Sequence, residues 1–177
     1  KSDVTPYAAQ MSGSGPIDYR ESERSIRGYV ETAASYGFPT TLFAHPEVAV
    51  GNMELLLSLE KQGACLGLHL HPYKFKSQNY EYDLGAYSTS EQREVLHRAM
   101  QVWESALGKP PEYFRAGYFS ANDSTYHVLH ELGFRGGSLS NPGRILPSHC
   151  SVWAGAEVYP HRAHFGFRLM KGDSDFI

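Results

Sequence analysis

The chain has few cysteines, no long hydrophobic run and no excess of one charge. Its 177 residues include two cysteines, and one possible pair does not establish an oxidising compartment. No apolar run approaches the roughly 20 residues that span a membrane. The formal net charge is −3, with 16 basic and 19 acidic residues mixed along the chain, so the polybasic stripe that nucleic acid requires is missing. We expect no transmembrane segment and no nucleic-acid partner.

Targeting signals, lipidation motifs, tags, internal repeats and low-complexity segments are also missing from the sequence, which leaves a cytoplasmic and a secreted or cell-envelope location both open. A hydrophobic content of 41% is ordinary for a globular protein and sufficient for one core. We therefore expect a single domain over residues 1–177. It begins at Lys1 and stops at Ile177 as though trimmed at both ends.

Helix and strand signals alternate along the chain. Apolar spacing, with turn residues between, predicts helices over 21–36, 52–62, 90–107 and 122–132, and strands over 40–44, 64–71 and 113–116, with residues 133–138 leading into another strand. The expected helix caps are Asn52, Ser90, and either Asn122 or Asp123. This alternation predicts an α/β fold of βα units around a parallel sheet, either open or closed into a barrel.

The pair His69 and His71 is the strongest chemical signal. Side chains two residues apart on a strand share a face, so the two imidazoles can converge on one metal ion if a carboxylate arrives from elsewhere. The alternative is a solvated strand end with ordinary hydrogen bonds. His45 and Arg115 also fall at or just after strand ends, where parallel α/β folds place their chemistry.

Several motifs resemble the polysaccharide deacetylases, the NodB-homology group or carbohydrate esterase family 4. The segment 114–119 is similar to the family's FRxPYG, Leu132-Gly133-Phe134 to its LGF turn, and Leu66-Gly67-Leu68-His69 to its EIGxH. The resemblance covers most of the chain. It implies a distorted parallel (β/α) barrel of the NodB type, incomplete at the termini, and it matches His69 to the first metal-binding histidine.

This sequence departs from the family pattern in three places. The second family histidine would fall at position 73, which is Tyr73, so His71 is the substitute ligand that strand geometry offers. The family's TFDDG can correspond only to residues 2–6, where Asp3 is the one aspartate. Asp3 is then either a metal ligand or the base, and we favour the ligand because a two-histidine site needs an anion. Gly117 replaces the proline of the RxPY motif.

The resemblance implies metal-dependent removal of N- or O-acetyl groups from a polysaccharide or glycan. A divalent ion, with zinc expected, would activate water. The predicted metal ligands are Asp3, His69 and His71, and the predicted catalytic residues are Asp3, Arg115 and His161, with His164 as another candidate for the general acid. Tyr118 or a backbone amide would stabilise the oxyanion, and Tyr73, in the aromatic loop 72–87, would stack on sugar.

Other functions remain open at this point. A metal amidohydrolase barrel also uses two such histidines, but on its first strand, and a cupin would lack the predicted helices. An amidase acting on a non-sugar carbon–nitrogen bond would keep the same chemistry. A catalytically silent deacetylase-like domain that binds glycan is favoured by the single aspartate in residues 2–6.

Overall fold

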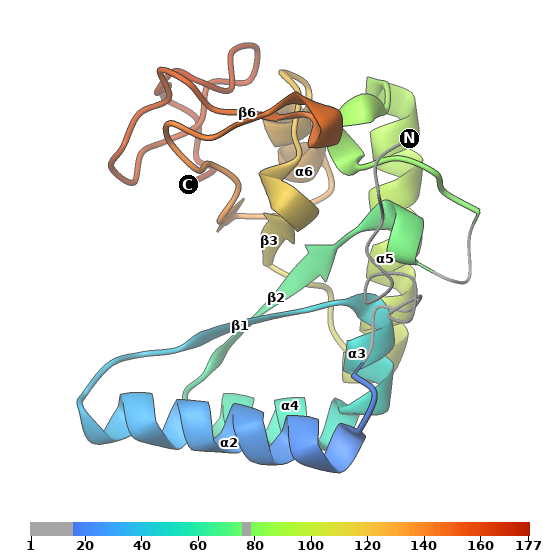
Figure 1. The fold of residues 1–177 in the computed structure, drawn as a ribbon, viewed down its shortest axis with the longest axis vertical. Helices are drawn as coiled ribbons and strands as arrows, with labels where there is room; N and C mark the ends of the chain where they lie inside the picture. Colours follow the sequence, from blue (N-terminus) through green and yellow to red (C-terminus); the bar gives the residue numbers. More distant parts are fainter. Residues whose placement is uncertain (1–15, 76–78) are drawn as a thin grey trace.

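The centre of the molecule is a sheet of four parallel strands, ordered β1-β2-β3-β4 (Figure 1). The structure is a computed structural model that describes residues 16–75 and 79–177. The strands are β1 (Thr41–Ala44), β2 (Cys65–Leu70), β3 (Tyr113–Ala116) and β4 (Gly136–Gly137). Because parallel neighbours need a crossover between them, each pair is joined by helix, as the sequence predicts. The described strands form part of a barrel wall and do not close it.

Five α-helices are described around this sheet. They are α2 (Tyr19–Ser35), α3 (Pro46–Gly51), α4 (Met53–Lys61), α5 (Thr89–Leu107) and α6 (Thr125–Glu131). Short 3₁₀ turns lie at Pro72–Lys74, Leu84–Ala86, Gly117–Phe119 and, after the last of these helices, Pro147–His149. A small antiparallel pair, β5 (Ile145–Leu146) and β6 (Ser151–Val152), follows the sheet. No described helix is long and apolar enough to cross a membrane.

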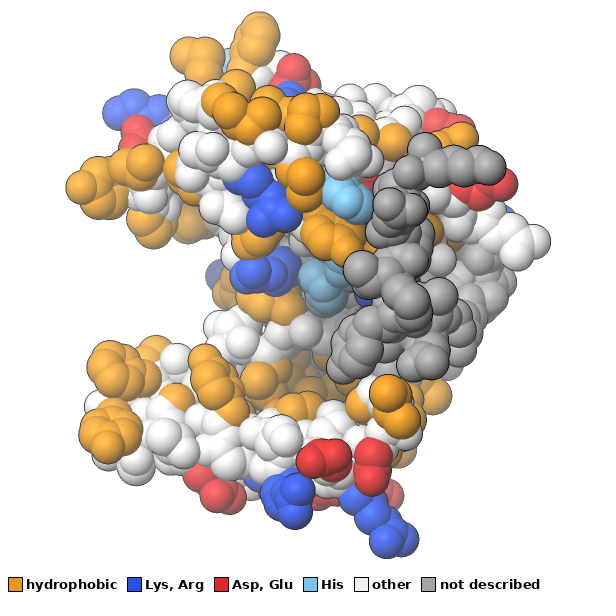
Figure 2. Space-filling model, viewed as in Figure 1, with side chains coloured by type: hydrophobic (Ala, Val, Ile, Leu, Met, Phe, Trp, Pro, Cys, Tyr) orange, Lys and Arg blue, Asp and Glu red, His pale blue; other side chains and the backbone are white. Residues whose placement is uncertain are grey.

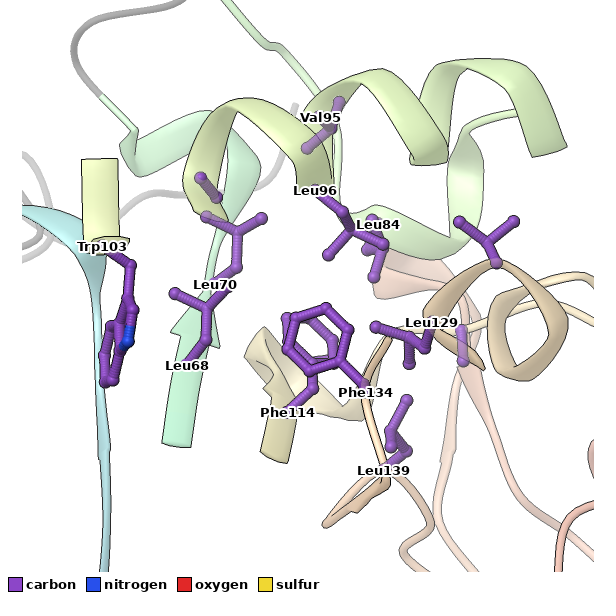
Figure 3. Close-up of a cluster of buried hydrophobic side chains, with 14 of the residues drawn as sticks. Leu68, Leu70, Leu84, Val95, Leu96, Trp103, Phe114, Leu129, Phe134 and Leu139 are labelled. Atoms are coloured by element: carbon purple, nitrogen blue, oxygen red, sulfur yellow. The ribbon is translucent and has the colours of Figure 1, made fainter. Parts of the chain in front are cut away.

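The main core lies between one face of the sheet and helices α5 and α6 (Figure 3). Leu68 and Leu70 of β2 are fully buried, as is Phe114 of β3. Leu96 and Trp103 come from the apolar stripe of α5, at a spacing that puts them on one side of the helix. Since neighbouring residues on a strand point to opposite faces, burying Leu68 and Leu70 turns Cys65, Gly67 and His69 toward the other face.

Two of the predicted helix caps are wrong, and a third, Asn52, is confirmed in its position only. Ser88, not Ser90, caps α5, because Ser88 and Glu91 complete a capping box with bonds in both directions. Asn52 precedes α4 but makes no side-chain cap bond. The helix α3 before it was not predicted, although Pro46 stands at its first position, where proline is favoured.

The second wrong cap concerns α6, which begins after Ser124 and not after Asn122 or Asp123. Asn122 lies two residues earlier, and its side-chain oxygen accepts a hydrogen bond from the Ser124 amide at 3.0 Å. Its side-chain amide donates to the carbonyls of Gly85 (3.1 Å) and Tyr87 (2.9 Å). Asn122 therefore fixes the loop before α5 against the loop before α6.

At the β4 edge, Ile177 lies beside the sheet. The Gly137 amide donates to the Ile177 carbonyl at 2.7 Å, and the Ile177 amide donates to the Arg135 carbonyl at 3.1 Å. A Cβ on Gly136 would lie 2.1 Å from the Ile177 carbonyl oxygen. Glycine is therefore required at 136 for the two backbones to approach this closely.

Candidate active site

The polar residues predicted at the strand ends lie at one rim of the sheet. His45 directly follows β1, and His69 pairs opposite Arg115 in the register of β2 and β3. His71 follows β2, with its ring centroid 4.9 Å from that of His69. The ring nitrogen Nε2 of His45 donates to the His71 carbonyl at 3.4 Å. The prediction that these residues share a rim is confirmed.

The tautomer of His69 is fixed by its hydrogen bond. Its Nδ1 lies 3.0 Å from the Arg115 carbonyl oxygen, and a carbonyl can only accept, so Nδ1 carries the proton. The lone pair is then on Nε2, which is the nitrogen available to a metal or a proton. A backbone carbonyl holding the far nitrogen is the usual way in which ligand histidines are oriented.

Burial keeps the histidines neutral near pH 7. It lowers the pKa of His71 to about 3 and that of His45 to about 4, and it also lowers the pKa of His69. Neighbouring positive charges add to the effect at all three rings. Metal binding requires deprotonated imidazole, so the histidines are in the protonation state that a metal site needs.

Two departures from the family pattern, His71 and Gly117, are in contact with each other. A Cβ on Gly117 would lie 2.3 Å from Nδ1 and 2.4 Å from Cγ of the His71 ring. The ring therefore occupies the space that any larger residue at 117 would need, including the family's proline. With the His71 ring in this position, residue 117 has to be glycine.

A buried carboxylate, Asp83, joins the histidines from the loop before α5. Its Oδ2 accepts a hydrogen bond from His149 Nδ1 at 2.7 Å, and its Oδ1 lies 4.0 Å from His71 Nδ1. Burial raises the pKa of Asp83, while the bond to His149 opposes the rise. Asp83 Oδ1 and His71 Nδ1 are both buried and have no hydrogen-bond partner among the described residues. The sequence analysis missed Asp83 and His149.

The loop that carries Asp83 is held by the segment after β3. The Gly85 amide donates to the Ser120 hydroxyl at 2.9 Å, in addition to the bonds from Asn122. The rings of Tyr118 and His149 lie 4.1 Å apart, and those of Tyr118 and His71 lie 5.0 Å apart. Tyr118 has the left-handed φ of 53°, which costs energy for a bulky residue. Through its ring contacts with His71 and His149, Tyr118 connects the end of β2 to the Asp83–His149 pair.

The remaining predicted residues are placed as follows. Arg115 donates to the Ser138 hydroxyl at 3.0 Å and lies over the Phe119 ring. The ring of Tyr73 lies edge-on to that of His71. Burial, and then a hydrogen bond with the Tyr118 side chain, raise the pKa of the Tyr73 hydroxyl. His161 bonds the Tyr159 carbonyl at 2.8 Å and lines a separate cavity of about 280 Å³. Asp3 lies outside the described residues.

A deep hollow lies beside this rim (Figure 2). Figure 2 shows histidine and Lys or Arg side chains on its wall, between the lobe that contains α2 and the lobe that contains β6. The exposed sheet face lines a cavity of about 790 Å³, to which Phe43, Cys65 and Tyr113 contribute. A second cavity of about 330 Å³ shares Phe43 and reaches His69. Of the rim residues, His45 and His69 therefore border the smaller of these two cavities.

Comparison with sequence models of known protein families shows which family this chain belongs to. The sequence model of the polysaccharide deacetylase family matches residues 17–137, from the start of α2 to the end of β4. The chain belongs to the polysaccharide deacetylase family. This match includes His69, His71, Asp83 and Arg115, while His149 and His161 follow it.

Two solved structures show the same fold. The structure of a putative polysaccharide deacetylase from Mycobacterium smegmatis is 22% identical with a TM-score of 0.51, and the match covers 63% of this chain and 36% of that one. A family 4 carbohydrate esterase from Streptomyces lividans, in complex with acetate, is 17% identical with a TM-score of 0.50, over 72% of this chain and 59% of that one. This deacetylase-family chain thus spans less than two thirds of either. No curated protein matches it.

Metal ligation is only partly represented in the described part of the chain. Among residues 16–75 and 79–177, no group of three or more His, Cys, Asp or Glu side chains is arranged to hold a metal ion. His69 and His71 supply two neutral nitrogen donors, which suits zinc. The two described donors therefore match zinc by their chemical type. The third predicted ligand, Asp3, is outside the described residues.

Proposed function

We propose that this domain is a metal-dependent deacetylase acting on acetylated carbohydrate. The observation that carries the proposal is the pairing of His69 with Arg115 at the open rim, which leaves Nε2 of His69 as the free nitrogen beside the neutral His71. Membership of the polysaccharide deacetylase family and a fold shared with a carbohydrate esterase that holds acetate support it.

In this proposal His69, His71 and Asp3 hold a zinc ion. When bound, such an ion polarises the acetyl carbonyl and lowers the pKa of a water to about 7, so that hydroxide is present at neutral pH. His69 is already oriented for this role by the Arg115 carbonyl. Asp3 would supply the negative charge that two neutral imidazoles lack.

The Asp83–His149 pair is suited to proton transfer. Asp83 accepts from His149 Nδ1, so the proton on that nitrogen is held and Nε2 is the atom that exchanges a proton with the substrate. A carboxylate that orients a histidine in this way is a recurrent arrangement in acid–base catalysis. His149 is therefore a further candidate, beside His161 and His164, for protonating the departing amine.

Arg115 and the tyrosines would position the substrate. In the family the corresponding arginine orients a catalytic aspartate, and here its bond to Ser138 holds it in place at the rim. Tyr118, whose ring lies edge-on to His71 and tilted against His149, would stabilise the developing oxyanion with its hydroxyl. Tyr73 is 37% exposed and offers its ring to sugar.

A silent, glycan-binding domain is the second candidate. It is favoured by the single aspartate in residues 2–6, where the family has two. Such a domain would bind oligosaccharide at the same rim and would release no acetate.

Metal content and acetate release test the proposal together. The protein is loaded with zinc, and acetate is assayed with N-acetylated oligosaccharides as substrate. His69→Ala should lose both the metal and the activity with the fold retained, whereas His97→Ala, which changes an exposed histidine on α5, should lose neither. Unchanged zinc in His69→Ala would refute the ligand assignment. Bound oligosaccharide without acetate release would support the silent domain.

The general acid is assigned by a second comparison. His149→Ala and His161→Ala are assayed with the same acetamide substrate and with an acetate ester whose leaving group needs no protonation. The true general acid should lose far more activity on the acetamide than on the ester. Equal losses on both substrates for both variants would remove this role from either histidine.

A further inference from the structure

The two nitrogens of the His71 ring differ in what can reach them. Nδ1 is buried, and a Cβ on Gly117 would lie 2.3 Å from it, so the ring packs against Gly117 on this side. Nε2 is therefore the nitrogen that a metal would use. A ligand imidazole gives one lone pair to the metal, which leaves the ring proton on the other nitrogen. In that arrangement Nδ1 of His71 is a buried N–H donor.

An unpaired acceptor lies near this donor. Asp83 Oδ1 is 4.0 Å from His71 Nδ1, and neither atom has a hydrogen-bond partner among the described residues. The side chains of Asp83 and His71 are only 7% and 15% exposed, and a buried donor and a buried acceptor that stay unpaired each cost free energy. An approach of about 1 Å would bring the two atoms to hydrogen-bond length.

The second oxygen of the same carboxylate is already in use. Asp83 Oδ2 accepts from His149 Nδ1 at 2.7 Å. The two oxygens of Asp83 therefore lie near two histidines from distant segments, His71 after β2 and His149 in the turn before β6. An ionised carboxylate can accept from both rings at once, whereas an amide at this position would have one acceptor oxygen for two donors.

The turns that carry Asp83 and His149 are fixed to the same segment after β3. Leu84, next to Asp83, is fully buried, and a Cβ on Gly85 would lie 2.8 Å from the Ala121 backbone. The Ala121 amide in turn donates to the carbonyl of Cys150, next to His149, at 3.1 Å. These contacts hold the carboxylate between the two rings.

We propose that Asp83 is a positioning residue for His71: its Oδ1 accepts the Nδ1 proton of His71 while its Oδ2 holds His149. One carboxylate then orients a metal ligand and a proton-transfer residue together. The proposal rests on the proposed function, in which His71 binds zinc. A carboxylate behind a ligand histidine fixes the ring and makes it a stronger donor to the metal. It also adds a negative charge to a site for which residues 2–6 supply one aspartate.

Nitrogen NMR of the histidine rings tests the bond without any assay of activity. In the metal-free parent protein, His71 should carry its proton on Nδ1, as a hydrogen-bonded N–H that exchanges slowly with water. Asp83→Ala removes both acceptor oxygens and should shift this signal, whereas Asp173→Ala, the same change at an exposed position, should not. A proton on Nε2 of His71 in the parent would overturn the proposal, and so would a His71 signal that Asp83→Ala leaves unchanged. The parent spectrum decides by itself if the variant does not fold.

Zinc affinity, measured by competition with a chelator, tests the consequence. Asp83→Ala should weaken zinc binding by about 10–100-fold, as loss of a carboxylate behind a ligand histidine does. His149→Ala leaves Oδ1 in place and should weaken it far less. In a His71→Ala background, Asp83→Ala should have no further effect on zinc affinity. An equal effect in both backgrounds, or equal losses in Asp83→Ala and His149→Ala, would show a structural role only and overturn the proposal.

Acetate release separates this proposal from the proposed function. Zinc binding that depends on Asp83, without acetate release, would overturn the deacetylase and leave the positioning role standing. Acetate release with equal zinc affinity in the parent and in Asp83→Ala would overturn the positioning role and leave the deacetylase standing. If the parent binds no zinc, the ligand assignment fails, and the metal-free spectra still decide whether Asp83 accepts from His71.

Discussion

Gly117→Ala tests whether residue 117 is glycine because of the His71 ring. The new Cβ would lie 2.3 Å from His71 Nδ1, and real Cβ atoms essentially never approach within 3.0 Å. The ring has to move, although it is packed between the rings of His69 and Tyr118. We expect the free energy of unfolding to fall by about 1–3 kcal/mol, the usual cost of overpacking. Zinc affinity should fall as well.

The same change should be harmless once the ring is removed. Gly117 does not have a left-handed φ, so alanine fits its backbone, and in a His71→Ser background Gly117→Ala should be neutral or stabilising by up to about 1 kcal/mol. Urea unfolding of the parent, the two single variants and the double variant gives the coupling free energy between positions 71 and 117, expected at about 2 kcal/mol. Gly28→Ala, with open space around its Cβ, is the control. Equal costs of Gly117→Ala in both backgrounds would refute the steric argument.

Three further predictions concern the rim and the scaffold. Arg115→Ala should reduce turnover more than it reduces zinc content, and activity equal to that of the parent would make the arginine structural. The buried His45 has a pKa of about 4 against 6.5 when unfolded, so the unfolded chain binds the proton first as the pH falls. Stability should therefore drop by up to about 3 kcal/mol between pH 6.5 and 4. Urea unfolding of His45→Gln with chelator present should show a flatter pH dependence, and an unchanged slope would exclude His45 as the source. Ser88→Ala should lower the free energy of unfolding by about 1 kcal/mol through loss of the capping box, whereas Ser90→Ala should change it little; the reverse order in urea unfolding would contradict the cap assignment.

Much of the scaffold could be predicted because its signals are local. The strand Tyr113–Ala116 was predicted with its observed bounds, and the helix stop at Gly108 is confirmed by its left-handed φ of 73°. The cap of α5 was misplaced by two residues, because three polar residues, Ser88 to Ser90, stand together and each is a plausible start. Only the reciprocal hydrogen bonds between Ser88 and Glu91 show which of the three residues is the cap.

The Asp83–His149 pair shows where sequence reasoning stops. The two residues are 66 positions apart, and neither belongs to a motif quoted from the sequence. His161 and His164 were chosen as candidate general acids by their late position alone. A proton-transfer pair is defined by a distance of about 3 Å between two atoms, and no spacing along the chain encodes a distance between loops that are folded together by tertiary contacts.

The sequence by itself determined the alternation of helix and strand, the pair of histidines on one strand face, and the family, because periodicity and motifs are properties of neighbouring residues. The tertiary structure alone decided which further contacts form at that rim: Asp83 with His149, and the His71 ring against Gly117. Their proximity depends on how parallel strands align at their carboxyl ends and on how the loops pack above them. Burial at that rim, in turn, sets the charge of the histidines.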